Sequence, residues 1–404
     1  MAALPARNLL FHPPFAWFFA ARVLSEFAQQ IAAVAVGWQI YTMTNSAAYL
    51  GLAGLAQFMP TALFTFVAGG IADRCDRKRV AQLCQAANAL TAGYLALGTY
   101  GGWLNVPEMF LAVTIFGLTT AFENPAVAAL LPAAAPPGEL QRATALATGA
   151  FQVAIVSGPA LGGLAYSAAP VAPWLLVLVA SAAAALCSGA IAVRTQIDSP
   201  GRPTFTELFA GVSFVRGNPA ILGSISLDLF AVLLGGATAL MPIYARDILH
   251  TGPWGLGILR GAPAVGALLM TAWLARRPLK SKAGLRLFQA VMVFGLASVV
   301  FGLSTVLWIS LAALAVMGAA DMVSMVLRIS LVQLATPDQM RGRVGAVNFL
   351  FVNASSQLGE FESGMTAALL GAMPSVVLGG LGTILVALLW MKLFPTLRDM
   401  EQVG

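Results

Sequence analysis

The sequence predicts an all-α membrane protein, with about twelve transmembrane helices in two pseudo-symmetric six-helix bundles. Three observations support this class. The chain of 404 residues is 59% hydrophobic and only 9% charged, with a mean hydropathy of +0.84. Its apolar residues form runs long enough to cross a bilayer, and its basic residues fall into alternate loops. Because a soluble domain carries roughly 25% charged residues, this composition leaves too few charges to cover a water-facing surface.

Each predicted span is a run of about 20 or more mostly apolar residues, the length that the hydrocarbon core of a bilayer requires. The runs cover residues 15–43, 47–71, 80–100, 108–132, 143–166, 174–193, 219–245, 254–274, 286–304, 307–335, 344–370 and 375–394. Several exceed about 25 residues, which predicts tilted helices or helices that extend beyond the bilayer.

Lysine and arginine predict the orientation, because cytoplasmic loops carry an excess of these residues. If the N-terminus is cytoplasmic, eighteen of the 22 lie in inside segments, three lie within spans and only Arg246 lies in an outside loop. We therefore expect both termini in the cytoplasm and a multi-pass protein of the cell (inner) membrane. The first apolar run is longer than the core of a signal peptide, so residues 15–44 are expected to form a mature first helix.

The longest polar stretch, residues 194–218, divides the spans six and six. Proline and glycine at residues 199–203 are typical of a linker. We expect an N-terminal bundle over residues 1–193, a cytoplasmic linker over 194–218 and a C-terminal bundle over 219–404. Five apolar residues share one helical face, which favours a short amphipathic helix on the cytoplasmic surface over a plain loop. They are Phe205, Leu208, Phe209, Val212 and Val215.

Weak internal similarity accompanies this division. At an offset of 203 residues, four positions of the first half match four of the second. The pairs are Tyr41 and Tyr244, Gly54 and Gly257, Pro60 and Pro263, and Ala72 and Ala275. Apolar sequences align easily by chance, but parallel repeats of six spans suit a transporter built from two bundles.

Several other classes of protein are disfavoured. The net charge of +6 comes from short basic clusters between apolar runs, which form no continuous patch for a nucleic acid. Three cysteines without C-x-x-C spacing and two histidines predict neither a disulfide framework nor a metal site. The chain has no phosphate-binding G-x-x-x-x-G-K-[ST] loop and no catalytic cluster, so we expect no cofactor and no ATP hydrolysis.

The strongest local motif is residues 69–79, Gly-Gly-Ile-Ala-Asp-Arg-Cys-Asp-Arg-Lys-Arg, between the second and third spans. The glycines permit a tight helix end. Asp73 lies at a membrane boundary, where it can face the positive N-terminus of a neighbouring helix. A basic loop alone would serve as a positive-inside anchor, but that reading leaves the aspartate unexplained.

This segment resembles the signature G-x-x-x-D-R-x-G-R-R/K of the major facilitator superfamily. The matching residues are Gly69, Asp73, Arg74, Arg77 and Lys78. Asp76 stands where the family has glycine, as in the branch of enterobactin exporters and macrolide efflux proteins, which residues 140–146, 240–245 and 341–344 also resemble. The resemblance implies the two-bundle fold, and it implies that Asp73 and Arg77 latch the bundles on the cytoplasmic side.

Two further segments bear on coupling. Gly158, Pro159, Gly162 and Gly163 resemble the end of the antiporter-associated motif of the fifth span, which favours export. Ordinary packing of small residues around a proline bend is the alternative. The fourth span has no arginine over residues 109–132, where the family normally carries one near its cavity. This departure weakens any proton-coupling scheme that depends on that arginine.

Nine charged residues lie in the interior of predicted spans, away from their ends, where charge is costly. They are Arg22, Glu26, Glu123, Asp228, Arg260, Asp321, Arg328, Glu360 and Glu362. The resemblance implies a cavity lined by spans one, four, seven and ten, which favours Glu26, Asp228 and Asp321 as proton or ion sites, with Arg22 and Glu360 as further candidates. Arg22 and Glu26 are four residues apart and can pair, and Arg328 can snorkel. Inter-helix ion pairs that fix packing are the alternative.

We therefore predict a monomeric secondary transporter that exports an amphipathic small molecule, a drug or a siderophore, against protons by alternating access. Candidate residues of the substrate cavity are Trp38, Tyr41, Gln57 and Asn124. A uniporter, an importer or a lipid transporter of the same fold remains an alternative, and a membrane-embedded enzyme is a more distant one.

Overall fold

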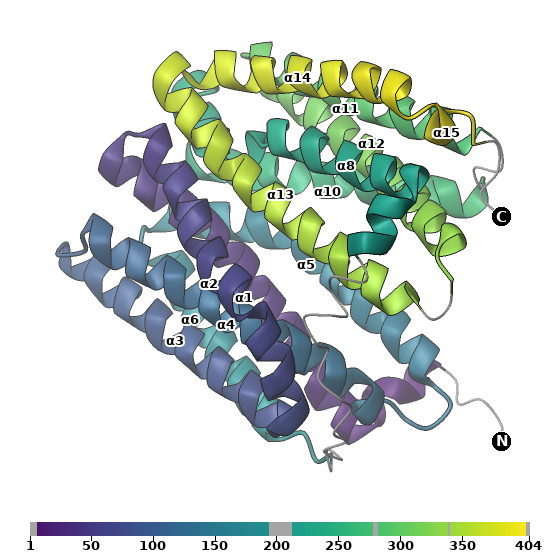
Figure 1. Ribbon diagram of the computed structural model, residues 1–404. Helices are drawn as coiled ribbons and strands as arrows, with labels where there is room; N and C mark the ends of the chain where they lie inside the picture. Colours follow the sequence, from purple (N-terminus) through teal and green to yellow (C-terminus); the bar gives the residue numbers. More distant parts are fainter. Residues whose placement is uncertain (1–5, 194–211, 278–281, 338–339, 401–404) are drawn as a thin grey trace. The chain divides into compact units, whose positions relative to one another are not determined.

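The computed structural model describes residues 6–193, 212–277, 282–337 and 340–400, and this part of the chain contains helices and no strands (Figure 1). Most of the expected linker, with Phe205, Leu208 and Phe209, lies outside the described residues. The chain forms two compact units. Each unit is held together by helices that meet along much of their length.

The first unit contains the described parts of residues 1–45, 56–201 and 251–261. Its helices are η1 (Ala6–Phe11), α1 (Pro13–Thr44), most of α2 (Ala47–Arg74), α3 (Arg77–Gly101), α4 (Val106–Ala134), α5 (Leu140–Ala168), α6 (Ala172–Gly189) and the start of α10 (Gly252–Arg276). Helix α1 packs against α4, α5 and α6, while α3 packs against α4 and α6. Helix α1 is therefore central to this unit.

The second unit contains the described parts of residues 46–55, 202–250 and 262–404. Its helices are the start of α2, α8 (Pro219–Leu234), η2 (Ala237–Leu240), α9 (Met241–Ile243), the π-helix η3 (Tyr244–Ile248), the rest of α10, α11 (Ala283–Leu303), α12 (Leu307–Ala335), α13 (Arg341–Leu370), α14 (Ala372–Leu393) and α15 (Pro395–Arg398). Helix α11 packs against α12 and α14, and α8 packs against α13 and α14 (Figure 1).

Every predicted span overlaps a helix of the described chain. In that part of the chain, nine helical segments are long and apolar enough to cross a membrane. Helices α1, α3 and α13 have 32, 25 and 30 residues and are long enough, but they carry more polar side chains. These polar side chains lie largely inside the units, as described below for α1 and α3.

The seventh predicted span, residues 219–245, falls within one helical segment, Pro219–Ile248, that is long and apolar enough to cross a membrane. The segment is not a single regular α-helix, because α8 ends at Leu234 and is followed by short helical turns. At this break, a Cβ added to Gly236 would lie 2.3 Å from the carbonyl oxygen of Gly359 on α13. The close approach of the two backbones thus requires glycine at position 236, where the α-helix is interrupted. The glycine pair at 235 and 236 is the signal in the sequence.

Many large apolar side chains point outward, and small residues fill much of the interior. Leu83, Leu90 and Leu97 are spaced by seven residues on α3 and are 70%, 76% and 68% exposed. The buried positions of α1 include Ala21, Ala28, Ala32 and Ala35. Small residues let membrane helices approach closely, while leucines suit lipid.

Local capping explains several helix ends. Asp76, the residue that departs from the family glycine, is the N-cap of α3 and accepts a hydrogen bond from Lys78 N at 3.2 Å. Asn105 and Glu108 form a capping box at the start of α4. Asn218 caps α8. Each cap satisfies backbone N–H groups that a helix start leaves without partners.

Residues 212–217 are helical, and part of the expected amphipathic face packs inside the second unit. Val215 is 4% exposed and belongs to an apolar cluster with Ile221 of α8, Val332 of α12 and Val344 of α13. Val212 packs against the same cluster. These two valines therefore contact neighbouring helices, which a helix lying only on the membrane surface would not require.

Candidate functional site

The interior of the first unit holds the carboxyl group of Glu123 on α4. Its Oε1 atom accepts a hydrogen bond from Ser25 Oγ of α1 at 2.5 Å and another from Gln85 Nε2 of α3 at 2.9 Å. Ser188 Oγ of α6 donates to Gln85 Oε1 at 2.7 Å. All four residues are at most 4% exposed. Polar groups therefore join four helices at this point.

A charged pair lies beside this cluster. Arg22 Nη2 is 3.0 Å from Glu26 Oε1, so the predicted pairing along α1 is confirmed. Glu26 is 5% exposed, and the Arg22 guanidinium carbon lies 5.4 Å from the ring centre of Phe151 on α5, a cation–π distance. Arg22 interacts electrostatically with both Glu26 and Glu123. Two carboxyl groups thus share the surroundings of one cation.

The glycine motif of α5 explains how that helix approaches α1. A Cβ at Gly158 or Gly162 would lie 2.6 or 3.1 Å from atoms of α1, and a Cβ at Gly163 would lie 2.5 Å from a carbonyl oxygen of α10. Pro159 lies inside a helix that runs from Leu140 to Ala168. The motif therefore lets α5 pack closely against α1 and α10.

In the second unit, Asp228 of α8 forms an ion pair with Arg328 of α12. The two side chains are only 6% and 5% exposed. The expectation that Arg328 snorkels to the surface is wrong, because its guanidinium is buried inside the unit and pairs there with Asp228. A buried pair of this kind satisfies both charges without water.

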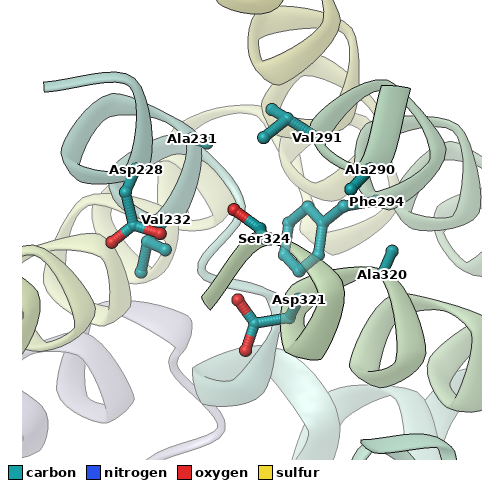
Figure 2. A pocket seen from close by; sticks show the side chains of 9 residues that line it. All are labelled: Asp228, Ala231, Val232, Ala290, Val291, Phe294, Ala320, Asp321 and Ser324. Carbon is teal, nitrogen blue, oxygen red and sulfur yellow. The ribbon is translucent and has the colours of Figure 1, made fainter. Parts of the chain in front are cut away.

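Asp228 also borders a pocket between α8, α11 and α12 (Figure 2). The pocket has about 250 Å³ of empty space, part of it open to the surroundings, and its polar lining comes from Asp228, Asp321 and Ser324. Figure 2 shows Asp321 and Ser324 on α12 and Phe294 on α11 around this space. Asp321 is exposed, whereas Asp228 is buried. The structure therefore brings two of the predicted coupling residues to one pocket.

The remaining predicted coupling residue, Glu360, lies on α13 near the start of α2. Its Oε2 atom would be 3.1 Å from a Cβ added to Gly54. The neighbouring acid Glu362 accepts a hydrogen bond from Thr366 Oγ1 at 2.7 Å on the same helix. The two glutamates of α13 thus have different surroundings.

The predicted gating motif is only partly described. The side chains of Gly69, Asp73 and Arg74 lie outside the described residues. Arg77 Nη1 donates to the carbonyl oxygen of Ala129 on α4 at 3.2 Å. Lys78 Nζ donates to the carbonyl oxygen of Ile191 beyond the end of α6 at 3.3 Å. These two cations therefore tie the start of α3 to the last third of α4 and to the segment that follows α6.

The predicted cavity residues fall into two groups. Trp38 and Tyr41 of α1 are 7% and 6% exposed, and the Trp38 ring meets Tyr166 of α5 edge-on at 6.3 Å. Gln57 of α2 and Asn124 of α4 are exposed. Trp38 and Tyr41 therefore lie in the interior of the unit, whereas Gln57 and Asn124 do not.

Sequence reasoning identified Glu123 as a costly acid but left it out of the favoured set, and it missed Ser25, Gln85 and Ser188 altogether. The partners come from helices far apart in sequence, so no local spacing reveals them.

Among the described residues, no group of three or more His, Cys, Asp or Glu side chains is placed to hold a metal ion. Proton binding is the chemistry that these isolated buried carboxyl groups support.

Comparison with known proteins identifies the family. The enterobactin exporter EntS of Citrobacter koseri is 28% identical over 407 residues, with 97% of this chain and 94% of the relative covered. EntS of Escherichia coli K12 is 26% identical at the same coverage.

Solved structures agree on the fold. A bacterial homologue of the human lysosomal transporter Spinster has a TM-score of 0.73 at 15% identity and covers 99% of this chain and 100% of its own. A bacterial homologue of the iron transporter ferroportin has a TM-score of 0.72 at 17% identity, with 96% and 99% covered. The Major Facilitator Superfamily pattern matches residues 10–360. The chain therefore belongs to the Major Facilitator Superfamily.

Proposed function

We propose that the protein is a secondary active transporter that exports an amphipathic small molecule across the cell (inner) membrane in exchange for protons. A catecholate siderophore of the enterobactin type is the first candidate substrate. The observation that carries this proposal is the similarity to enterobactin exporters over 97% of the chain. The buried carboxyl groups of both units supply groups that can bind and release protons.

The topology that we propose has twelve spans and two cytoplasmic termini, with a bundle on each side of residues 194–218. The excess of basic residues in alternate loops supports this orientation. We further propose that a monomer carries out transport, that Asp73 and Arg77 belong to the cytoplasmic latch, and that Gln57 and Asn124 contribute to the substrate path. The exposure of Gln57 and Asn124 supports their assignment.

The test is transport by purified protein in proteoliposomes. With the lumen more acidic than the outside, we expect inside-out molecules to accumulate enterobactin in the lumen and a protonophore to abolish the accumulation. A proton moving down 100 mV supplies about 2.3 kcal/mol, enough for a roughly 50-fold solute gradient. A panel of lipophilic cations and macrolides tests the substrate class in the same assay.

Facilitated diffusion is the second candidate, because no arginine occurs over residues 109–132 and Val113 of α4 is buried there. The two functions differ in one result. A uniporter equilibrates the substrate at a rate independent of the pH gradient and never concentrates it. Equal flux with and without the gradient would therefore exclude proton antiport.

A further inference from the structure

Glu123 and its hydrogen-bonded neighbours Ser25, Gln85 and Ser188 lie in a region with more acidic than basic groups. Two carboxyl groups, those of Glu26 and Glu123, lie near the single guanidinium of Arg22. Arg22 forms its ion pair with Glu26. Glu123 instead receives neutral donors, the Ser25 hydroxyl and the Gln85 amide, and both bind the same oxygen, Oε1.

The second oxygen of Glu123 has no counterpart to these contacts. Its Oε2 atom is buried and has no hydrogen-bond partner among the described residues. An ionised carboxylate spreads its charge over two oxygens and needs donors or a cation at both. A neutral carboxylic acid loses far less when one oxygen is buried without a partner.

No second cation of the described chain lies beside Glu123. Among the described residues that surround Glu123, the titratable groups are Arg22 and Glu26 of α1 and the thiol of Cys84 on α3. Arg77 is the next cation, but it binds the carbonyl oxygen of Ala129, six residues or about 9 Å further along α4. Two acids and one cation balance only when one acid is protonated.

We propose that Glu123 is the proton-carrying residue of this transporter and that Arg22 controls its proton. In the arrangement seen here, Arg22 neutralises Glu26 and Glu123 holds the proton. A shift of Arg22 toward Glu123 stabilises the Glu123 carboxylate and sends its proton to Glu26, which has lost its cation and gives the proton up when the movement opens it to water. Because Arg22 and Ser25 both lie on α1, a movement of α1 against α4 changes the Arg22–Glu123 separation and the Ser25–Glu123 hydrogen bond together. The transport part of this inference rests on the proposed proton-coupled export, whereas the protonation state does not.

Glutamine at position 123 is a suitable probe, because it imitates a protonated glutamate. It keeps an oxygen that accepts from Ser25 and Gln85, so Glu123→Gln is expected to fold. The matched control is Glu108→Gln in the first turn of α4, fifteen residues before Glu123, where Glu108 is half-buried and serves in the helix cap. A glutamine there retains the capping bond.

The direct test is infrared spectroscopy of the purified protein in nanodiscs near neutral pH, as difference spectra between each variant and the wild type. Protonated carboxylic acids give a separate carbonyl band. We expect Glu123→Gln to lose one acid band. We expect Arg22→Gln to gain one, because both acids then lack a cation, and Glu108→Gln to leave this region flat. An unchanged acid band in Glu123→Gln would overturn the proposal.

Transport gives the second readout, in the vesicle assay with enterobactin. We expect Glu123→Gln to lose accumulation, from up to about 50-fold per proton at 100 mV to equal concentrations, while exchange of labelled for unlabelled substrate persists. Accumulation at the wild-type level in Glu123→Gln would overturn the role of Glu123 in coupling. If the wild type itself accumulates nothing, the proposed export fails, whereas the infrared bands still report whether Glu123 holds a proton.

Discussion

The buried ion pair between Asp228 and Arg328 gives a quantitative prediction for stability. Arg328 is only 4% exposed, and Asp228→Ala leaves its buried guanidinium without an ion-pair partner. Breaking such a pair on one side costs about 3–5 kcal/mol of unfolding free energy. At about 2–4 °C per kcal/mol for a unit of this size, the midpoint of thermal unfolding should fall by roughly 6–20 °C.

The assay is thermal unfolding of the detergent-solubilised protein, followed by size-exclusion chromatography after heating. The matched control is Asp247→Ala. Asp247 lies 3.7 Å from Arg246 in an exposed pair, and surface pairs contribute at most about 1 kcal/mol. The double variant Asp228→Asn/Arg328→Gln should lose less stability than the sum of its single variants, because it leaves no buried charge.

The reasoning would be refuted by an Asp228→Ala protein that unfolds at the wild-type temperature. It would also be refuted by single and double variants whose losses simply add, because additive losses mean that the two side chains do not interact.

Three further predictions concern the first unit and the loop after α2. Asp73→Asn should slow transport while the amount of protein in the membrane, measured by immunoblot, stays constant; wild-type rates would contradict the proposed latch. Asp76→Ala should destabilise α3 by about 0.5–2 kcal/mol, with Asp76→Asn nearly neutral, as read by thermal unfolding; equal losses would exclude a capping role. A Cβ at Gly257 would lie 2.5 Å from the Pro159 carbonyl oxygen, so Gly257→Ala should cost about 1–3 kcal/mol, whereas Gly149→Ala, with nothing within 4 Å, should cost none.

The all-helical fold and its helices could be predicted from the sequence because membrane helices depend on local properties. An apolar run of sufficient length is itself the signal, so the predicted ends of α4 and α12 agree with the structure within a few residues. The pairing of Arg22 with Glu26 was likewise predictable, because a separation of four residues places both side chains on one face of a helix.

The partners of buried polar groups could not be predicted, because they are tertiary contacts. The position of Arg328 near the end of a predicted span indicated a snorkelling side chain, whereas in the fold it pairs with Asp228 of another helix. Glu123 looked like one acid among several, and only the arrangement of four helices shows that neutral donors hold one of its oxygens. The break at Gly236 was missed because apolar runs continue across it, although the constraint there is the approach of another backbone.

The most direct test of proton-coupled export is the number of protons exchanged when substrate binds. Calorimetry of purified protein with enterobactin, in two buffers that differ in ionisation enthalpy, measures this number at equilibrium. We expect binding to the wild type to release a proton and binding to Glu123→Gln to release none. Binding to the wild type with the same apparent enthalpy in both buffers would contradict the coupling proposed here.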